Sequence, residues 1–209
     1  MSKRIIVING KGGIGKDTLI GAIESMNEPY IEVYNESSID PIRGMVARGF
    51  DGIRLLSKAA KVKDNAYRAL LSTMKKAVDD FYMINYGVKY TNDYLKACTI
   101  DYINGVGNYQ DSSEDSVLFV HVREPENITA YLNSIKGMLK ESDTEAVTLL
   151  VTSCRAQEDY GNDSDNNVEN YPYDFVYRSD EDINSERKKF RTFFLKKIMK
   201  KKIMKKENV

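Results

Sequence analysis

The sequence is poor in the residues that most often carry catalysis or metal binding. It has one histidine, His121, and two cysteines, Cys98 and Cys154, among 209 residues. With a single histidine, we expect neither a Ser-His-Asp mechanism nor a metal site built from several histidines. The cysteines lie far apart and have no C-x-x-C partner, so the sequence indicates neither a disulfide framework nor a cysteine metal site.

Net charge and long apolar runs are also missing. Lys plus Arg and Asp plus Glu both number 31, so the overall charge favours neither nucleic acid nor an acidic membrane as a partner. No apolar stretch approaches the roughly 20 residues that span a bilayer, and the N-terminus has no signal-peptide core. We therefore expect a cytoplasmic protein, a monomer or a homodimer, with one α/β domain and a sizeable core.

The most informative stretch follows the first apolar segment. Residues 5–8 are β-branched, which favours a buried parallel strand, and a glycine-rich loop and a helix follow. Glycines let main-chain N–H groups approach an anion, and the helix N-terminus adds donors and a favourable dipole. The spacing is that of a Walker A loop, whose lysine reaches the β- and γ-phosphates of a nucleoside triphosphate. The expected nucleotide-binding residues are Gly10, Lys11, Gly12, Gly13, Ile14, Gly15, Lys16, Asp17 and Thr18.

One position departs from the usual loop. Asp17 stands where Ser or Thr is expected, and Thr18 follows it. Because that hydroxyl normally holds Mg²⁺, Asp17 would hold the metal directly or through water, or leave it to other groups. A glycine-rich turn without any ligand is the alternative interpretation of the whole stretch.

The order of the expected elements predicts the fold. After the first strand, we expect strands over residues 30–34, 117–122, 146–152 and 173–177. Helices are expected over residues 17–26, from residue 40, and over residues 126–139 and 183–206. This alternation predicts an α/β protein with a P-loop nucleoside triphosphatase or kinase fold, in which helices flank a parallel five-stranded sheet.

We expect residues 1–209 to form a single domain, and three segments within it lie outside the alternating strands and helices. Residues 53–107 contain no convincing strand and are typical of two or three helices, broken around residues 85–87, so we interpret them as a helical insertion. Residues 156–170 are rich in Asp, Asn and Gly and predict a lid-like loop or disorder. Residues 196–209 form a basic C-terminal tail.

Charged residues follow several expected strands. Asp40 looks like an N-cap with Pro41 at the first helical position, and Arg43 lies one turn later. Arg123 and Arg155 follow the strands at 117–122 and 146–152. Ligands of open α/β sheets bind beyond the carboxyl ends of the strands, and arginine there suits a phosphoryl group or a carboxylate.

Each of these residues also has a structural interpretation. Asp40 serves equally as a helix cap, and the two roles are compatible. Arg123 is equally suited to an ion pair with Glu124 or another carboxylate. Arg68 lies in a basic helical segment that is typical of a solvated face, although Leu71 and Met74 share a face toward which Arg68 would project.

Two resemblances follow from these motifs. Residues 11–16, Lys-Gly-Gly-Ile-Gly-Lys, resemble the deviant Walker A loop of the partitioning and cell-division ATPases, in which a lysine at the position of Lys11 reaches across a dimer. The later aspartates of that family are missing, because the strand at 117–122 ends in Arg-Glu-Pro. This resemblance implies a nucleotide-driven switch.

The second resemblance extends over more of the chain. Residues 15–18, Gly-Lys-Asp-Thr, resemble the loop of the bacteriophage-type deoxynucleoside monophosphate kinases and are similar to that of the animal phosphomevalonate kinases. Residues 38–43 resemble their Ala-Asp-Pro-Ile-Lys element, and residues 67–71 an Arg-x-x-Leu helix of the acceptor-binding region. Residues 122–125 look like an Arg-Glu-Pro turn of nucleotide-kinase-like proteins.

The kinase resemblance implies transfer of the γ-phosphoryl group of ATP to a small phosphorylated or hydroxyl acceptor, in which alignment and charge neutralisation supply most of the catalysis. Lys16 and the loop amides would bind the β- and γ-phosphates, Thr18 the α-phosphate, and Asp17 would hold Mg²⁺ with water and nucleotide oxygens. A nucleotide-binding module without catalysis, acting through its helical insertion and lysine tail, is a third interpretation.

The same resemblance implies roles on the acceptor side. Asp40 would orient or deprotonate the acceptor, or support the metal. Arg43, Arg68 and Arg123 would hold the acceptor phosphate. Arg155, at the root of the lid-like loop, would close on the transferring group and help to exclude water.

Overall fold

In this computed structural model, the structure describes residues 2–26, 29–49, 65–109, 115–153, 167–180 and 182–200. Their centre is one parallel sheet of five strands in the order β2-β3-β1-β4-β5. The strands are β1 (Lys3–Asn9), β2 (Ile31–Ser37), β3 (Asp115–His121), β4 (Glu145–Thr152) and β5 (Phe175–Arg178). The predicted α/β class and the five-stranded parallel sheet flanked by helices are confirmed.

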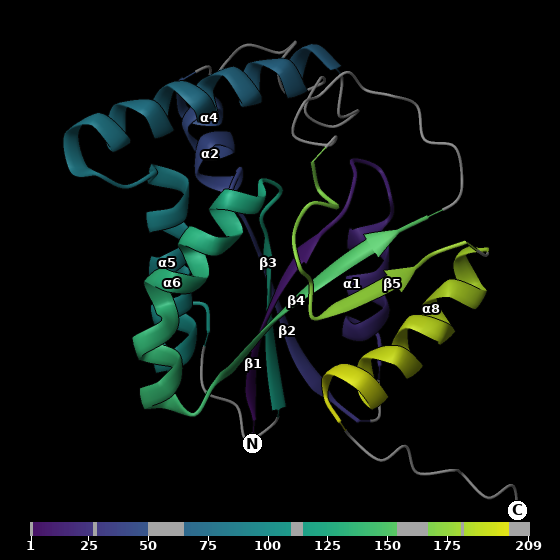
Figure 1. Ribbon diagram of the computed structural model, residues 1–209. Helices are drawn as coiled ribbons and strands as arrows, with labels where there is room; N and C mark the ends of the chain where they lie inside the picture. The colour runs from purple at the N-terminus through teal and green to yellow at the C-terminus, as the bar shows by residue number, and fades with distance from the viewer. Residues whose placement is uncertain are drawn as a thin grey trace, which may run out of the picture.

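Helices cover both faces of this sheet (Figure 1). On one face lie α1 (Lys16–Glu24) and α8 (Ile183–Phe193), and on the other lie α5 (Tyr90–Asn104) and α6 (Pro125–Ser142). The central strands are therefore apolar on both sides: every residue from Ile5 to Ile8 and from Val117 to Val120 is fully buried. None of the helices in the described ranges combines the length and apolar content that a membrane crossing requires.

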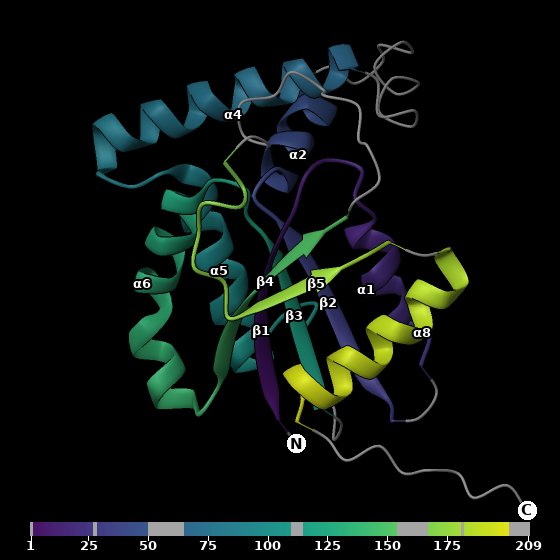
Figure 2. The ribbon, with the colours of Figure 1, turned by 45° about the vertical axis from the view of Figure 1, so that its right-hand side comes forward.

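The carboxyl ends of the adjacent strands β1 and β3 form a topological switch point of the sheet. The chain leaves β1 through α1 on one face, whereas it leaves β3 through α6 on the opposite face (Figure 2). Because successive crossovers here run in opposite directions, the two helices diverge from neighbouring strand ends. Such a switch point is where open α/β sheets bind their ligands.

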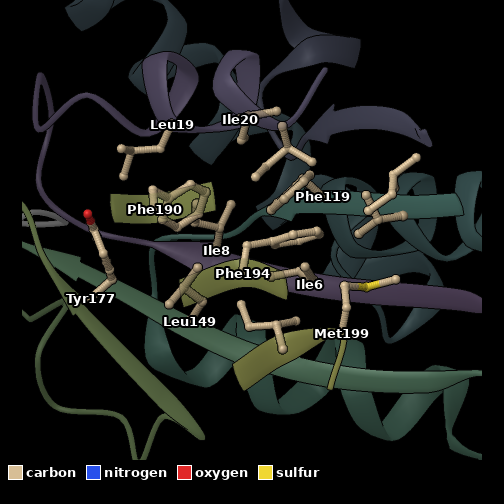
Figure 3. Close-up of a cluster of buried hydrophobic side chains, with 14 of the residues drawn as sticks. Ile6, Ile8, Leu19, Ile20, Phe119, Leu149, Tyr177, Phe190, Phe194 and Met199 are labelled. Atoms are coloured by element: carbon tan, nitrogen blue, oxygen red, sulfur yellow. The ribbon is translucent and has the colours of Figure 1, made fainter. Parts of the chain in front are cut away.

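The larger core lies between the sheet and the pair α1 and α8. Phe190 and Phe194 are fully buried there against Ile8 and Phe119 (Figure 3). The chain continues from α8 into a π-helical turn, η1 (Phe194–Ile198). The predicted helix over 183–206 therefore ends earlier, and the predicted tail from residue 196 begins inside the core, because Ile198 and Met199 are buried. Residues 201–209 lie outside the described residues.

The described part of the segment between β2 and β3 consists of helices joined by short turns. It contains α2 (Asp40–Gly49) and α4 (Asn65–Tyr86) before α5, and the break between α4 and α5 matches the expected one, with Gly87 at φ 72°. Leu71 of α4 packs against Ile42 and Val46 of α2. In both ribbon views, α4 passes over α2 beyond the carboxyl ends of the strands (Figures 1 and 2). Residues 50–64 lie outside the described residues.

Candidate functional site

The loop of residues 10–15, here called the glycine loop, joins β1 to α1. Its first residue, Gly10, has a φ of 145°, and a Cβ atom built there would lie 2.5 Å from the main-chain oxygen of Val151 in β4. Gly15 precedes α1 with a φ of 92°. Both positions require glycine, because L-residues rarely adopt these backbone angles. The loop thus passes against the neighbouring strand with main chain only.

Lys16, the first residue of α1, turns back over this loop. Its Nζ atom donates hydrogen bonds to the main-chain oxygens of Gly10, at 2.6 Å, and Lys11, at 3.1 Å. The first intrahelical bond runs from the amide of Leu19 to the oxygen of Gly15, at 3.1 Å. The N-terminus of α1 and the Lys16 ammonium therefore lie together at the carboxyl end of β1, an arrangement that favours an anion.

The remaining loop residues differ in exposure. Gly12 is buried, Gly13 is exposed with a φ of 77°, and Ile14 packs partly against the core. Thr18 is half-buried, whereas the side chains of Lys11 and Asp17 are exposed to solvent. The structure thus leaves both charged groups accessible to a ligand from outside the loop.

Asn9, the last residue of β1, holds the glycine loop in place. Its side chain is fully buried, accepts a hydrogen bond from the amide of Gly10 at 2.8 Å, and donates to the main-chain oxygen of Arg123 at 2.8 Å and to Tyr173 Oη at 2.7 Å. Tyr173 in turn donates to the main-chain oxygen of Val168 at 2.6 Å. One amide thus fastens together three segments that are far apart in the sequence.

The start of α2 differs from its prediction in one respect. Asp40 is not the N-cap: its carboxylate reaches back to the amide of Ser37 at 2.7 Å, while Ser37 Oγ accepts a hydrogen bond from the amide of Ile39 at 3.4 Å. Asp40 is instead the first residue of α2, because the first intrahelical bond runs from the amide of Arg43 to the oxygen of Ile39, at 2.9 Å. The other carboxylate oxygen accepts a hydrogen bond from Arg43 Nη1 at 2.7 Å.

The carboxyl group of Asp40 has a perturbed acidity. Burial raises its pKa, and the Arg43 guanidinium and the Ser37 amide oppose this effect only in part. A group with a raised pKa at the carboxyl edge of the sheet is a candidate for proton transfer. The hydrogen bond that Asp40 accepts from the Ser37 amide is observed, and the catalytic role remains a prediction.

His121 lies at the switch point of the sheet. It is the last residue of β3 and pairs in register with Ile8 of β1 on one side and with Ser37 of β2 on the other. Its Nε2 atom lies 2.7 Å from Oδ1 of Asn35. The only histidine of the chain therefore stands between the strand that leads to the glycine loop and the strand that leads to α2.

The electrostatic surroundings of His121 show which charges converge here. Burial and the positive charge of Lys16 lower its pKa to about 4, Arg123 and Arg43 act in the same direction, and Asp17 opposes them. These cations come from the start of α1, from α2 and from the residue pair after β3. Two of the predicted phosphate-binding arginines are thus brought together with the loop lysine.

The turn after β3 is fixed by contacts on both sides. Glu124 caps the start of α6 and contacts Lys75 of α4, with Nζ 3.5 Å from Oε1, and it accepts a hydrogen bond from Asn127 at 3.1 Å. Burial raises the pKa of Glu124, but the Lys75 ammonium and the hydrogen bonds outweigh it and hold the pKa below the usual range. Glu124 thus pairs with Lys75 and connects the turn after β3 to α4.

Three further predictions have different outcomes. Arg68 is half-buried on α4, one turn before Leu71, which packs on the helix that carries Arg43. Arg155 lies outside the described residues, as does the predicted lid from residue 156 to residue 166. In the described part of the chain, no three His, Cys, Asp or Glu side chains are grouped to share a metal ion. The exposed Asp17 nevertheless fits Mg²⁺, which needs only one or two carboxylates when phosphates and waters complete its shell.

Asn9, Asn35 and His121 did not stand out as site residues in the sequence. Their common signal is position: each is a polar side chain at or near the carboxyl end of a parallel strand. No protein-family model matches the sequence, and no curated protein matches it. The function of the site therefore has to be inferred from its own residues.

Proposed function

We propose that this protein is an ATP-dependent phosphotransferase with a P-loop kinase fold, acting on a nucleoside monophosphate or a similar small phosphorylated metabolite. One observation carries the proposal: the Lys16 ammonium lies over the glycine loop at the switch point of the sheet, and Arg43 and Arg123 follow the carboxyl ends of the next two strands. A concentration of positive charge from separate segments suits a reaction between two highly charged anions.

On the donor side, the N-terminus of α1, the loop amides and the Lys16 ammonium would bind the triphosphate. The hydrogen bonds from Lys16 Nζ to Gly10 and Lys11 place the ammonium over the loop before any ligand arrives. Each phosphate oxygen that replaces a carbonyl would bind the same donor more strongly, because charge-assisted bonds are the stronger ones. The donor site therefore needs little rearrangement.

On the acceptor side, α2 supplies the groups. Arg43 and Arg123 would hold the phosphate of the acceptor, and Asp40 would orient the group that attacks the γ-phosphoryl group or accept its proton. Arg43 is held by the carboxylate of Asp40 at 2.7 Å, so an arriving phosphate would compete for the guanidinium and release the carboxylate toward the acceptor.

Asp17 would hold Mg²⁺ beside the phosphates. With Mg²⁺ held there, positive charge would be supplied against the charge that develops on the phosphates. The chain itself positions this carboxylate at the first turn of α1, next to the lysine that binds the same phosphates.

The decisive experiment is an acceptor panel. Purified protein with ATP and Mg²⁺ should form ADP only when a suitable nucleoside monophosphate or small phosphorylated metabolite is added. Lys16→Ala should abolish this turnover, whereas the matched control Lys76→Ala should not, because Lys76 is exposed on α4 and pairs with Asp80 at 2.9 Å. ADP formation that ignores every acceptor would refute the proposal.

A switch of the partitioning type is the second candidate, and the exposure of Lys11 favours it. A lysine that reaches into a second subunit must be free of the core of its own chain. In that case ATP should cause dimerisation, measured by sedimentation, and Lys11→Ala should prevent it while retaining ATP binding. Thermal stabilisation by ATP without turnover or dimerisation would instead support a binding module.

A further inference from the structure

The charge of this protein is distributed unevenly along the chain. Residues 183–209 contain 11 Lys and Arg and two Glu, which gives a net charge of +9, whereas residues 1–182 contain 20 Lys and Arg and 29 Asp and Glu, which gives −9. The balanced total is therefore the sum of an acidic part and a basic C-terminal segment. A local excess of charge attracts surfaces of the opposite sign even when the whole chain has no net charge.

The structure places the described part of this segment on α8 and η1, at the surface of the molecule (Figures 1 and 2). One side of these two elements faces the core, where Phe190 and Phe194 are fully buried and Ile198 is 1% exposed. Within the described ranges, no carboxylate forms an ion pair with Lys196 or Lys197. The exposed cations, here called the basic face, are Arg187, Lys188, Lys189, Lys196, Lys197 and Lys200.

Two other charged residues of α8 are bound by the rest of the protein and do not belong to the basic face. Glu186 is 5% exposed and accepts hydrogen bonds from Tyr177 Oη, at 2.7 Å, and from the amide of Asp180, at 2.8 Å. Arg191 donates to the main-chain oxygen of Ala22, at 2.7 Å. Since Glu186 is the only acidic residue of α8 and η1, no carboxylate of these elements offsets the basic face at the surface.

The basic face extends away from the proposed phosphate site. Because α8 follows the carboxyl end of β5 and runs back along the sheet, η1 lies near the amino ends of the strands. Ile198 of η1 accordingly packs in the same core cluster as Met26, after α1, and Ile31, at the start of β2. The glycine loop lies at the opposite, carboxyl ends of the strands. A partner bound at η1 would therefore leave the glycine loop accessible.

The sequence continues the charge pattern beyond the described residues. Residues 201–205, Lys-Lys-Ile-Met-Lys, repeat residues 196–200, and residues 201–209 contain four Lys and one Glu. In the first copy of the repeat, Ile198 and Met199 are buried while the three lysines are exposed. The second copy adds cations directly after the basic face in the sequence, together with two apolar residues, Ile203 and Met204.

The composition of this surface favours lipid headgroups over nucleic acid. Together, the basic face and residues 201–209 have ten cations, of which nine are lysines, and lysine lacks the planar fork that suits arginine to nucleic acid. Proteins that bind single strands stack bases on aromatic rings, but Phe190 and Phe194 are buried and Phe193 packs against the core. Lysine clusters are typical of segments that bind acidic phospholipids, and Ile203 and Met204 suit the boundary of the acyl chains.

We propose that the basic face, continued by residues 201–209, is a binding surface for an anionic phospholipid bilayer, on which the protein lies peripherally. The attraction is electrostatic, because lysine ammonium groups meet acidic headgroups within a Debye length of about 10 Å. This inference goes beyond the proposed function and does not depend on it.

Cosedimentation with lipid vesicles tests this surface directly. The purified protein should bind vesicles that contain about one-third phosphatidylserine in phosphatidylcholine, and it should not bind vesicles of phosphatidylcholine alone. Raising the salt from about 0.1 M to about 1 M shortens the Debye length from about 10 Å to about 3 Å and should release the protein. Absence of binding to the anionic vesicles at the lower salt, or equal binding to both kinds of vesicle, would overturn the inference.

Two matched double variants assign the binding to the basic face. Each lysine near an anionic surface contributes about fivefold to affinity, so Lys196→Gln/Lys197→Gln should bind the anionic vesicles about 25-fold more weakly than wild type. The control Lys136→Gln/Lys140→Gln removes the same charge from exposed positions on α6, on the other face of the sheet, and should bind like wild type. Equal losses in the two variants would show an effect of net charge alone and would overturn the assignment.

Competition with nucleic acid separates the two kinds of polyanion. A short RNA or DNA duplex, added at a phosphate concentration equal to that of the phosphatidylserine, should displace little protein from the vesicles. Displacement of most of the protein would assign the basic face to nucleic acid and overturn the lipid proposal.

The outcomes also separate this inference from the proposed function. Lys196→Gln/Lys197→Gln should retain acceptor-dependent ADP formation, because the glycine loop lies at the other edge of the sheet. Vesicle binding without turnover on any acceptor would support the inference and count against the kinase. Turnover without vesicle binding would overturn the inference and leave the kinase proposal standing.

Discussion

The close approach of Gly10 to β4 gives a stringent test of the loop geometry. Replacing Gly10 by alanine puts a methyl group 2.5 Å from the main-chain oxygen of Val151 and 3.2 Å from Cγ2 of Ile14. The oxygen belongs to a strand held on both sides, so it cannot move away cheaply. Overpacking costs about 1–3 kcal/mol, and the φ of 145° adds about 1–3 kcal/mol of backbone strain.

We therefore expect Gly10→Ala to lower the free energy of unfolding by about 2–6 kcal/mol, a large share of the roughly 5–15 kcal/mol of a typical domain. Urea denaturation followed by circular dichroism measures it. The matched control is Gly137→Ala on α6, where no atom lies within 4 Å of the new Cβ and helix propensity should stabilise the protein by about 0.5–1 kcal/mol. A loss below about 1 kcal/mol at Gly10 would show that the loop does not press against β4 as the structure places it.

The other predictions concern the core, the anchor of the loop and the acceptor side. Phe194→Ala should lower the free energy of unfolding by about 3–5 kcal/mol, because the ring is fully buried. The control Lys196→Ala, at an exposed residue, should change the free energy of unfolding by less than about 0.5 kcal/mol. Similar losses for the two variants in urea denaturation would contradict the packing of η1. Asn9→Ala leaves the partners at Gly10, Arg123 and Tyr173 without its amide and should cost about 2–4 kcal/mol with weaker ATP binding by calorimetry; unchanged affinity would show that the loop needs no such anchor. Asp40→Asn should stop turnover without lowering the free energy of unfolding at pH 7. Burial raises the pKa of Asp40, so the folded state favours the protonated carboxyl. The wild-type protein should therefore lose stability relative to the variant as the pH rises through that pKa. A wild type that gains stability over this range relative to Asp40→Asn would refute the assigned direction.

The loop shows why some site residues are predictable. Residues 10–18 can be recognised in the sequence because three local features predict the same loop. These features are β-branched residues before the loop, glycines within it and a lysine at the start of the helix. The structure places them as that order predicts, between a buried strand and a helix. A local motif of this kind needs no distant contact to be recognised.

Asp40 shows where a local pattern misleads. Asp before Pro is typical of an N-cap, yet the amide that its carboxylate accepts from belongs to Ser37. The helix begins at Asp40 itself, and Ile39 precedes it as the residue whose oxygen accepts the first intrahelical bond. Ser37 lies next to the carboxylate because β2 runs to Ser37 rather than to residue 34 and stays paired with β3 up to His121.

The sequence by itself determined the class of the fold, the order of its strands along the chain and the glycine loop, because hydrophobic period, turn chemistry and helix starts depend on neighbours in sequence. Only the tertiary structure decided that Asn9 fastens the loop to Arg123 and Tyr173, and that His121 faces Lys16, Arg43 and Arg123. These relations depend on strand order and register, which bring residues more than a hundred positions apart into contact. The pairing of distant strands cannot be recognised in a single sequence. The residues at the centre of the site could therefore be identified only from the tertiary structure.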